Sequence, residues 1–348
     1  MKDIDNNVKE SKMQAKFIHF VGIDVSKKWI DVCVLINGDK SVLHQGRFEQ
    51  NKQGFADLKK WLLKLTENQI HQLFICIENT GLYDDALLYF LTDKGFTVCL
   101  ENAAKIKASI RDRRAKNDQL DARNIALYAL RHSDELEVWQ KPRPVVDQLK
   151  QLLAARTSLL GHLTSIKQAQ KEIETFNWSK QKKIKNYQAG IKGLQKDIEQ
   201  IEADIWELIK SDETLYKMFL LLISIPAIGK VTAYHFICYT NEFKRVKSGK
   251  NLSSYCGVVP FQEKSGTSRS SPARVSKEAN RTLKKLLHLC ALTALKMKGE
   301  FAIYYQRKIA EGKHVLKVIN AIRNKLALRI AAVIRNQEPY NENYIYQQ

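Results

Sequence analysis

Four carboxylates stand at positions from which they could bind metal ions. Asp24 ends the first apolar run of the chain, and Glu78 directly follows a later one. Asp118 and Asp121 are three residues apart at the start of a predicted helix, so they share one face of it. Because neighbouring strand ends meet at one edge of an α/β sheet, the four side chains could converge. Their oxygens could hold two Mg²⁺ ions about 4 Å apart, an arrangement that serves phosphoryl transfer.

The same acids also have a purely structural interpretation. An aspartate can close a turn, and the helix dipole favours acids in the first turn of a helix. Spacing alone leaves the two interpretations equally open. Basic residues near the aspartate pair favour the metal site, because they would contact phosphates beside it. These residues are Arg111, Arg113, Arg114, Lys116 and Arg123.

A second group of reactive side chains lies in a basic, serine-rich loop at 243–276. Lys264, Arg269, Arg274 and Lys277, in the loop and just after it, supply charge for a phosphate and for an anionic transition state. A serine needs a base or a metal to become a nucleophile, and no histidine lies nearby in the sequence. The loop could equally be a flexible, solvated segment. The candidates include Ser253, Ser254, Ser265, Ser268, Ser270, Ser271 and Ser276.

The charge balance indicates a polyanionic partner. The 348 residues include 57 Lys plus Arg and 37 Asp plus Glu, a net charge of +20. Residues 1–141 carry +2, residues 142–210 carry +4 and residues 211–348 carry +14. The longest apolar stretches fall well short of the ~20 residues that span a bilayer, so no membrane partner is expected. A nucleic acid is therefore the favoured partner of the C-terminal part.

A helix predicted over 276–297 adds to the basic surface. Ser276 is its expected N-cap, and Arg281 and Lys284 lie opposite its apolar face. A charged stripe of this kind is the ordinary surface of an amphipathic helix. The near absence of acids favours contacts to a nucleic-acid backbone instead.

The elements that must position these residues follow from hydrophobic periodicity. Over 17–141 the order is β-β-β-α-β-α-β-α, which predicts an α/β domain with a mixed sheet and matches ribonuclease-H-like folds. The predicted strands are 17–23, 29–36, 41–48, 73–77 and 96–100. The predicted helices are 51–66 and 83–94, and helical material extends from 102 to about 132.

A long helical segment separates this domain from the C-terminal part. Apolar residues recur at steps of three and four through 142–210, with an interruption at 177–183. The seam predicts an antiparallel helical hairpin or an oligomerising coiled coil, with arms reaching ~45 Å. A plain helical linker is the other interpretation. The predicted parts are a tail at 1–16, the α/β domain at 17–141, the arm at 142–210 and a mainly helical domain at 211–348.

Four motifs in order resemble a known family. GIDVSK (22–27), IENTG (77–81), KNDQLDAR (116–123) and GVVPFQEKSG (257–266) are similar to motifs of the DEDD transposases of the IS-one-ten (IS110) insertion-sequence family. The resemblance runs from about residue 20 to residue 335. It implies a RuvC-like nuclease domain, a coiled coil and a C-terminal transposase domain.

The resemblance also implies roles for single residues. Asp24, Glu78, Asp118 and Asp121 would be the Mg²⁺-binding tetrad, and Ser265 would be the nucleophile that forms a covalent phosphoserine. A structured noncoding guide RNA, often called bridge RNA, would pair with donor and target DNA. A homodimer or homotetramer joined through the coiled coil, acting in the bacterial cytoplasm at the nucleoid, is the expected assembly.

Two departures from the family pattern are present. Lys264 stands before Ser265 where members often have a second serine, which leaves one serine before Gly266. Ala227 stands where members usually have glycine in a Pro-Gly-Ile-Gly turn, and alanine is strained wherever φ must be positive.

Two other functions remain open at this point. A metal-dependent nuclease of the Holliday-junction-resolvase type would use the carboxylates and water, without a serine. A non-catalytic nucleic-acid-binding scaffold would need neither. A covalent protein–DNA adduct distinguishes the serine mechanism from both.

Overall fold

A computed structural model describes most of the chain. The chain divides into two compact units, Met1–Lys141 and Pro142–Gln348. The described residues are 17–36, 39–79, 81, 83–109, 118–176, 185–244, 246, 248–261, 264–265, 269–270, 274–275 and 279–341. The N-terminal tail predicted at 1–16 lies outside them. In the described part, no helix is both long and apolar enough to cross a bilayer.

A five-stranded mixed sheet forms the first unit. The strand order is β3-β2-β1-β4-β5; β1, β2 and β3 are antiparallel neighbours, while β4 and β5 run parallel to β1. The mixed α/β sheet predicted from the element order is confirmed. Its strands are β1 (His19–Val25), β2 (Trp29–Ile36), β3 (Asp39–Glu49), β4 (Leu73–Asn79) and β5 (Thr97–Asn102).

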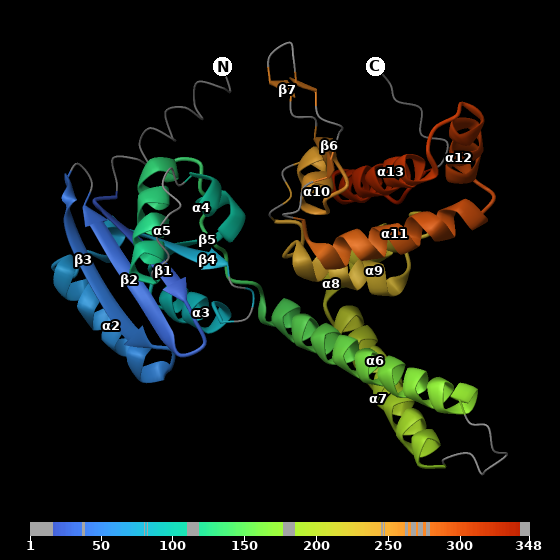
Figure 1. The fold of residues 1–348 in the computed structure, drawn as a ribbon, viewed down its shortest axis with the longest axis horizontal. Helices are drawn as coiled ribbons and strands as arrows, with labels where there is room; N and C mark the ends of the chain where they lie inside the picture. The colour runs from blue at the N-terminus through green and yellow to red at the C-terminus, as the bar shows by residue number, and fades with distance from the viewer. Residues whose placement is uncertain are drawn as a thin grey trace. The chain divides into compact units, whose positions relative to one another are not determined.

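Helices cover both faces of this sheet (Figure 1). One face packs Ile23, Val32 and Ile75 against α2 (Lys52–Leu65) and α3 (Asp85–Asp93). The opposite face packs against α4 (Ala103–Ser109) and α5 (Asp118–His132). Burial is nearly continuous along the central strands, because successive side chains point to opposite faces and helices cover both faces.

Two long helices begin the second unit. α6 (Pro144–Phe176) and α7 (Lys185–Ser211) lie against each other (Figure 1). Leu153 and Ile205 share a buried cluster, and Arg156 pairs with Glu202 at 2.5 Å. A later residue on α6 therefore meets an earlier residue on α7, so the two helices are antiparallel. Whether further chains join them in a coiled coil stays a prediction.

The rest of the second unit is mainly helical. α8 (Glu213–Ile223), α9 (Lys230–Tyr239), α10 (Gly249–Tyr255), α11 (Arg281–Lys296), α12 (Glu300–Ala310) and α13 (Val315–Asn336) pack around a common apolar core. Between α10 and α11 four two-residue strands are described: β6 (Pro260–Phe261), β7 (Lys264–Ser265), β8 (Arg269–Ser270) and β9 (Arg274–Val275). β6 pairs with β9 and β7 with β8, so the strands make two rungs of one hairpin.

The C-terminal part departs from the sequence prediction in two places. The stretch expected to be a loop contains helix α10, which Ser248 caps by accepting a hydrogen bond from the Asn251 N–H at 3.1 Å. The predicted N-cap Ser276 is wrong, because α11 begins at Arg281. Its cap is Asn280, whose side-chain oxygen accepts from the Leu283 N–H at 2.9 Å. An asparagine satisfies an unpaired helix N–H as well as a serine does.

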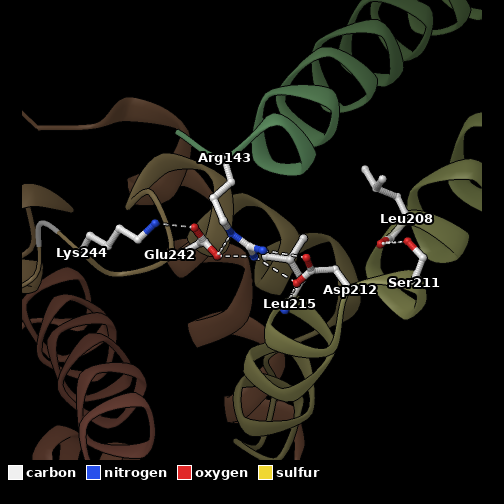
Figure 2. A network of polar contacts seen from close by, with 7 residues as sticks. All are labelled: Arg143, Leu208, Ser211, Asp212, Leu215, Glu242 and Lys244. Atoms are coloured by element: carbon white, nitrogen blue, oxygen red, sulfur yellow. Dashed lines mark hydrogen bonds and ion pairs between the residues drawn. The ribbon is translucent and has the colours of Figure 1, made fainter. Parts of the chain in front are cut away.

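A polar network fixes the N-terminal end of α6 (Figure 2). The Arg143 guanidinium donates to both Asp212 oxygens, at 2.7 and 3.0 Å, and to Glu242 Oε1 at 2.8 Å from Nε. Lys244 Nζ donates to Glu242 Oε2 at 2.8 Å. Hydrogen bonds from Arg143 lower the pKa of Asp212. Burial raises the pKa of Glu242, but hydrogen bonds from Arg143 and Lys244 outweigh it, so the net shift is downward.

The turn between α8 and α9 contains a strained alanine. Ala227 has φ of 69°, in the left-handed region that glycine adopts without cost. This is the position at which the resemblance implied a glycine. The Ala227 side chain packs partly against the apolar core, which offsets some of the strain.

Candidate functional site

Asp24 and Glu78 lie on adjacent parallel strands near their carboxyl ends. Ile23 on β1 pairs with Ile77 on β4, so each acid is the next residue along its strand. β1 extends to Val25, which places Asp24 within the strand and not after it, as the sequence had suggested. Residues in register on neighbouring strands point to the same face. The two side chains therefore lie side by side on one face of the sheet.

The face that carries both acids is the one that α5 covers. A Cβ built on Gly22 would lie 2.2 Å from Ala122 O and from Ala126 N. Gly22 therefore faces α5, and so does Asp24, two residues later. The same alternation places Glu78 on the side of Cys76, which is buried in the cluster that includes α5 residues. Only glycine allows a helix backbone to approach the strand this closely.

The start of α5 lies toward the acids. Ala122 and Ala126 approach Gly22, whereas Ala129 packs in a cluster with Phe17 and Phe20, further back along β1. α5 therefore runs antiparallel to β1, and its first turn points to the strand ends that hold Asp24 and Glu78. Asp121 is half-buried in that turn, beside Ala122. Asp118 opens the helix, and its side chain lies outside the described residues.

Carboxylate oxygens are the donors that Mg²⁺ prefers, so the chemistry of this donor set fits a divalent cation. Glu78 currently forms an ion pair with Lys107 Nζ at 3.5 Å, and Asp24 also has interactions. No three His, Cys, Asp or Glu side chains in the described part of the chain are close enough together to hold a metal. Lys107 is the described cation that a metal ion at Glu78 would replace.

The register adds three charged residues that the sequence analysis missed. Asp31 lies opposite Asp24 on β2, and Glu101 lies opposite Glu78 on β5. Arg47 lies opposite Asp31, and its guanidinium donates to both Asp31 oxygens, at 2.8 and 3.0 Å. All five residues form a row across the same face of the sheet. A signal was present, since Asp31 is the lone acid in an otherwise apolar strand.

The predicted phosphate contacts of the first unit are described only in part. Arg123 is exposed on α5. The other four, Arg111, Arg113, Arg114 and Lys116, lie outside the described residues.

Ser265 lies in the inner rung of the hairpin between α10 and α11. Its backbone pairs with Arg269, and Lys264 pairs with Ser270. In the outer rung, Arg274 pairs with Phe261. The side chains of these strands lie outside the description, as does Lys277.

His235, on α9, is a poor candidate for activating the serine. Burial is the main cause that lowers the pKa of His235 to about 4, with a smaller effect of Arg156. Its ring stacks on Tyr239, with centroids 5.7 Å apart. His235 is therefore a neutral, packed side chain on α9.

Arg281 and Lys284 occupy different environments on α11. Arg281 is exposed at the first position of the helix, whereas Lys284 is half-buried. Burial lowers the pKa of Lys284, and the nearby Arg323 lowers it further. Lys284 therefore lies near another cation, and no described acid pairs with either of them.

Two family models match separate parts of the chain. The DEDD_Tnp_IS110 model, described as "Transposase", matches residues 21–173. The model described as "Transposase IS116/IS110/IS902 family" matches residues 220–306. The first match includes the four carboxylates, and the second includes Ser265 and Lys284. Together the two matches cover more than half of the sequence.

Known proteins resemble the chain over most of its length or over part of it. A pilin gene-inverting protein of Moraxella lacunata is 27% identical over 327 residues, which are 93% of this chain and 98% of that protein. The transposase for insertion sequence element IS1328 of Yersinia enterocolitica is 30% identical over 148 residues, covering 41% of this chain and 42% of its own length. Among solved structures, Thermus thermophilus RuvC aligns at 13% identity with a TM-score of 0.27, covering 35% of this chain and 99% of RuvC.

Proposed function

Since this chain belongs to the IS116/IS110/IS902 family of transposases, we propose that it cleaves and rejoins DNA strands through a covalent bond to Ser265. One observation carries the proposal. Asp24 and Glu78 lie side by side on adjacent parallel strands, on the face covered by α5, whose first turn carries Asp118 and Asp121. A basic hairpin in the second unit carries the serine.

The four acids are the residues that would hold Mg²⁺ in this proposal. Bound there, the metal would stabilise the charge on the attacking and leaving oxygens of phosphoryl transfer. Glu78 would bind after releasing Lys107, which then remains available to a nearby phosphate. Arg47 keeps Asp31 paired, so this neighbour of Asp24 is already neutralised by a bidentate contact.

Ser265 would supply the nucleophilic oxygen. Its Oγ attacks a DNA phosphorus and forms a P–O bond, while the P–O bond to a deoxyribose oxygen breaks. The serine proton passes to a base, and the departing sugar oxygen takes up a proton. A sugar hydroxyl of another strand then attacks the phosphoserine, which regenerates the serine and joins the strands. The phosphodiester count is unchanged, so rejoining needs no external energy source.

A guide RNA would select the DNA in this proposal. Pairing between the RNA and both DNA partners would read sequence, and the protein would contact backbones. The excess of +14 over residues 211–348 supports a large nucleic-acid surface. Sequencing the RNA that co-purifies with the protein tests this part: a single structured species is expected, and random cellular RNA contradicts it.

The arm supports an oligomer. Strand exchange joins several DNA ends, so at least two active sites must meet. Apolar residues near the free end of the arm keep substantial exposure, including Ile173 at 38%. We propose that they pack against another chain.

The serine step is tested by Ser265→Ala. The variant should lose strand exchange and the protein–DNA adduct that survives a denaturing gel, while DNA binding persists. Ser270→Ala, in the opposite strand of the same hairpin, is the matched control and should recombine normally.

Two outcomes separate the alternative functions. Recombination by Ser265→Ala without an adduct would overturn the serine mechanism in favour of a resolvase-type nuclease. If Asp24→Asn also leaves recombination unchanged, the protein would be a non-catalytic scaffold.

A further inference from the structure

Three helices around the base of the serine hairpin contain no acid. α10 has one basic residue, α11 has four and α13 has five, and the three sequences include neither Asp nor Glu. α13 packs on both α10 and α11. By contrast, α12 carries Glu300, which pairs with Arg329 at 2.6 Å. These three helices therefore form one basic region, which lies next to the hairpin.

The segment leading into the hairpin is rigidly held. Gly257 has φ of 62°, and a Cβ there would lie 2.1 Å from the Ala279 Cβ. Asn320 on α13 donates its amide N–H to the Val258 carbonyl at 2.9 Å. Across the base, the Asn280 N–H donates to the Tyr255 carbonyl at 2.9 Å. A group bound to this segment would have a fixed position relative to the hairpin.

Lys284 and Arg323 flank this held segment from α11 and α13. The Lys284 Cδ lies 3.7 Å from a Cβ built on Gly257. Arg323 is three residues after Asn320, on the same face of α13, and its Nε is buried without a hydrogen-bond partner in the described part of the chain. Neither cation pairs with a described acid. Burial lowers the pKa of both groups, and Arg323 also lowers that of Lys284.

Two partly buried cations near each other repel, and an anion bound between them removes the repulsion. A cavity of about 440 Å³ adjoins the same segment at Val259, between α10 and α13. Its lining includes Val259, Ser253 and Asn324. Ser253 Oγ and Asn324 Oδ1 are buried without partners in the described part of the chain. Unused hydrogen-bonding groups therefore lie close to the segment that the two cations flank.

We propose that Lys284 and Arg323 together bind one backbone phosphate of the DNA strand that the serine hairpin acts on. The inference rests on the proposed function for the identity of the strand. DNA is favoured over RNA because the cations flank the base of the hairpin that carries Ser265. Arginine and lysine on opposite sides of a phosphate would fix the register of the strand before Ser265 reaches it.

The test compares two double variants of equal charge. Lys284→Gln with Arg323→Gln removes the cation pair. Lys296→Gln with Arg335→Gln changes the same residue types on the same two helices, at exposed positions in their last turns. Binding of a fluorescein-labelled DNA duplex is measured by anisotropy between about 50 and 200 mM salt. The cation-pair variant should weaken binding several-fold and reduce the salt slope by about 1, and the control should keep the wild-type slope.

Folding is measured separately for each variant. Inorganic phosphate should raise the Tm of the wild type and of the control, but not that of the cation-pair variant, because a ligand stabilises the state that binds it. Lys284→Arg, which keeps the charge, should retain the wild-type salt slope. Equal slopes for the two double variants would overturn the proposal.

The outcomes also separate this inference from the proposed function. The binding assay needs no strand exchange, and it is repeated in the Ser265→Ala background. Recombination by Ser265→Ala would contradict the serine mechanism and leave the phosphate site standing if the slopes still differ. A slope difference with single-stranded RNA but not with DNA would overturn the assignment of the site to DNA.

Discussion

Gly22 decides how closely α5 can approach the sheet. The backbone of Ala122 and Ala126 occupies the space in which any side chain at position 22 would lie. Asp24 is two residues along β1, and Asp121 precedes Ala122, so the contact also sets the distance between acids of the candidate site. A glycine in a strand usually weakens it, and this one is retained for a close approach.

We predict that Gly22→Ala separates α5 from the sheet. Overlap with two backbone atoms should cost more than about 3 kcal/mol in the free energy of unfolding, and DNA cleavage should be lost. Gly190→Ala is the matched control, because nothing lies within 4 Å of a Cβ at this position in the second turn of α7. It should stabilise the protein by about 0.5–1 kcal/mol. Urea unfolding measures both, and equal effects of the same sign would contradict the packing argument.

The network at the start of α6 shows how one element is fixed to its neighbours. Arg143 connects the first turn of α6 with the N-cap of α8 and with the turn after α9. That turn contains three successive left-handed residues, Asn241, Glu242 and Phe243, with φ of 48°, 58° and 62°. Such backbone is costly, and buried contacts of Glu242 and Phe243 offset the cost.

Arg143→Met should lower stability in a pH-dependent way. At pH 7 the loss should be about 2–3 kcal/mol, less than for a fully buried pair, because the Arg143 side chain is 36% exposed. The pKa values of Asp212 and Glu242 are lowered in the folded state. Their contribution is therefore complete above their unfolded pKa values and is lost as pH falls through the lower folded values.

The difference between wild type and Arg143→Met should consequently shrink below about pH 4. Urea midpoints from pH 7 to pH 3 measure it, with Arg335→Met on α13 as an exposed control. A difference that stays constant with pH would show that Arg143 acts through packing alone.

The apolar seam on α7 is buried to different degrees along the helix. Near the arm's root, Ile205 and Ile209 are fully buried in the core of the second unit. Toward the free end, Ile191 and Leu194 are only half-buried against α6. A seam that one neighbour covers incompletely fits the proposed packing of a second copy.

Ile191→Asp with Leu194→Asp should therefore reduce self-association. Each aspartate would lose its hydration in an apolar contact between chains, which disfavours association. The other side of α7 stays in contact with water. The mass of the complex with RNA and DNA, from light scattering, should fall from a dimer or tetramer toward the monomer. Gln195→Asp, exposed beside the seam, should not change it. A wild type that is monomeric with both nucleic acids would contradict the role of the arm.

Local pattern was sufficient for much of this protein. Short apolar, β-branched runs and the order of the elements predicted the mixed sheet, because a strand that is covered on both faces shows its burial in its own sequence. The charge asymmetry between residues 1–141 and 211–348 is likewise a property of composition. Asp24, Glu78 and Asp121 were identifiable because each stands at a strand end or at a helix start.

Tertiary structure alone determined the contacts between distant residues. Strand register places Asp31, paired with Arg47, beside Asp24, and no spacing in the sequence contains that register. Arg323 is one of five basic residues on α13. Only the packing of that helix on α11 places Arg323 near Lys284 and the base of the serine hairpin. Periodicity assigns each residue to one face of its own helix or strand. Which of these faces pack together depends on how the whole core is buried.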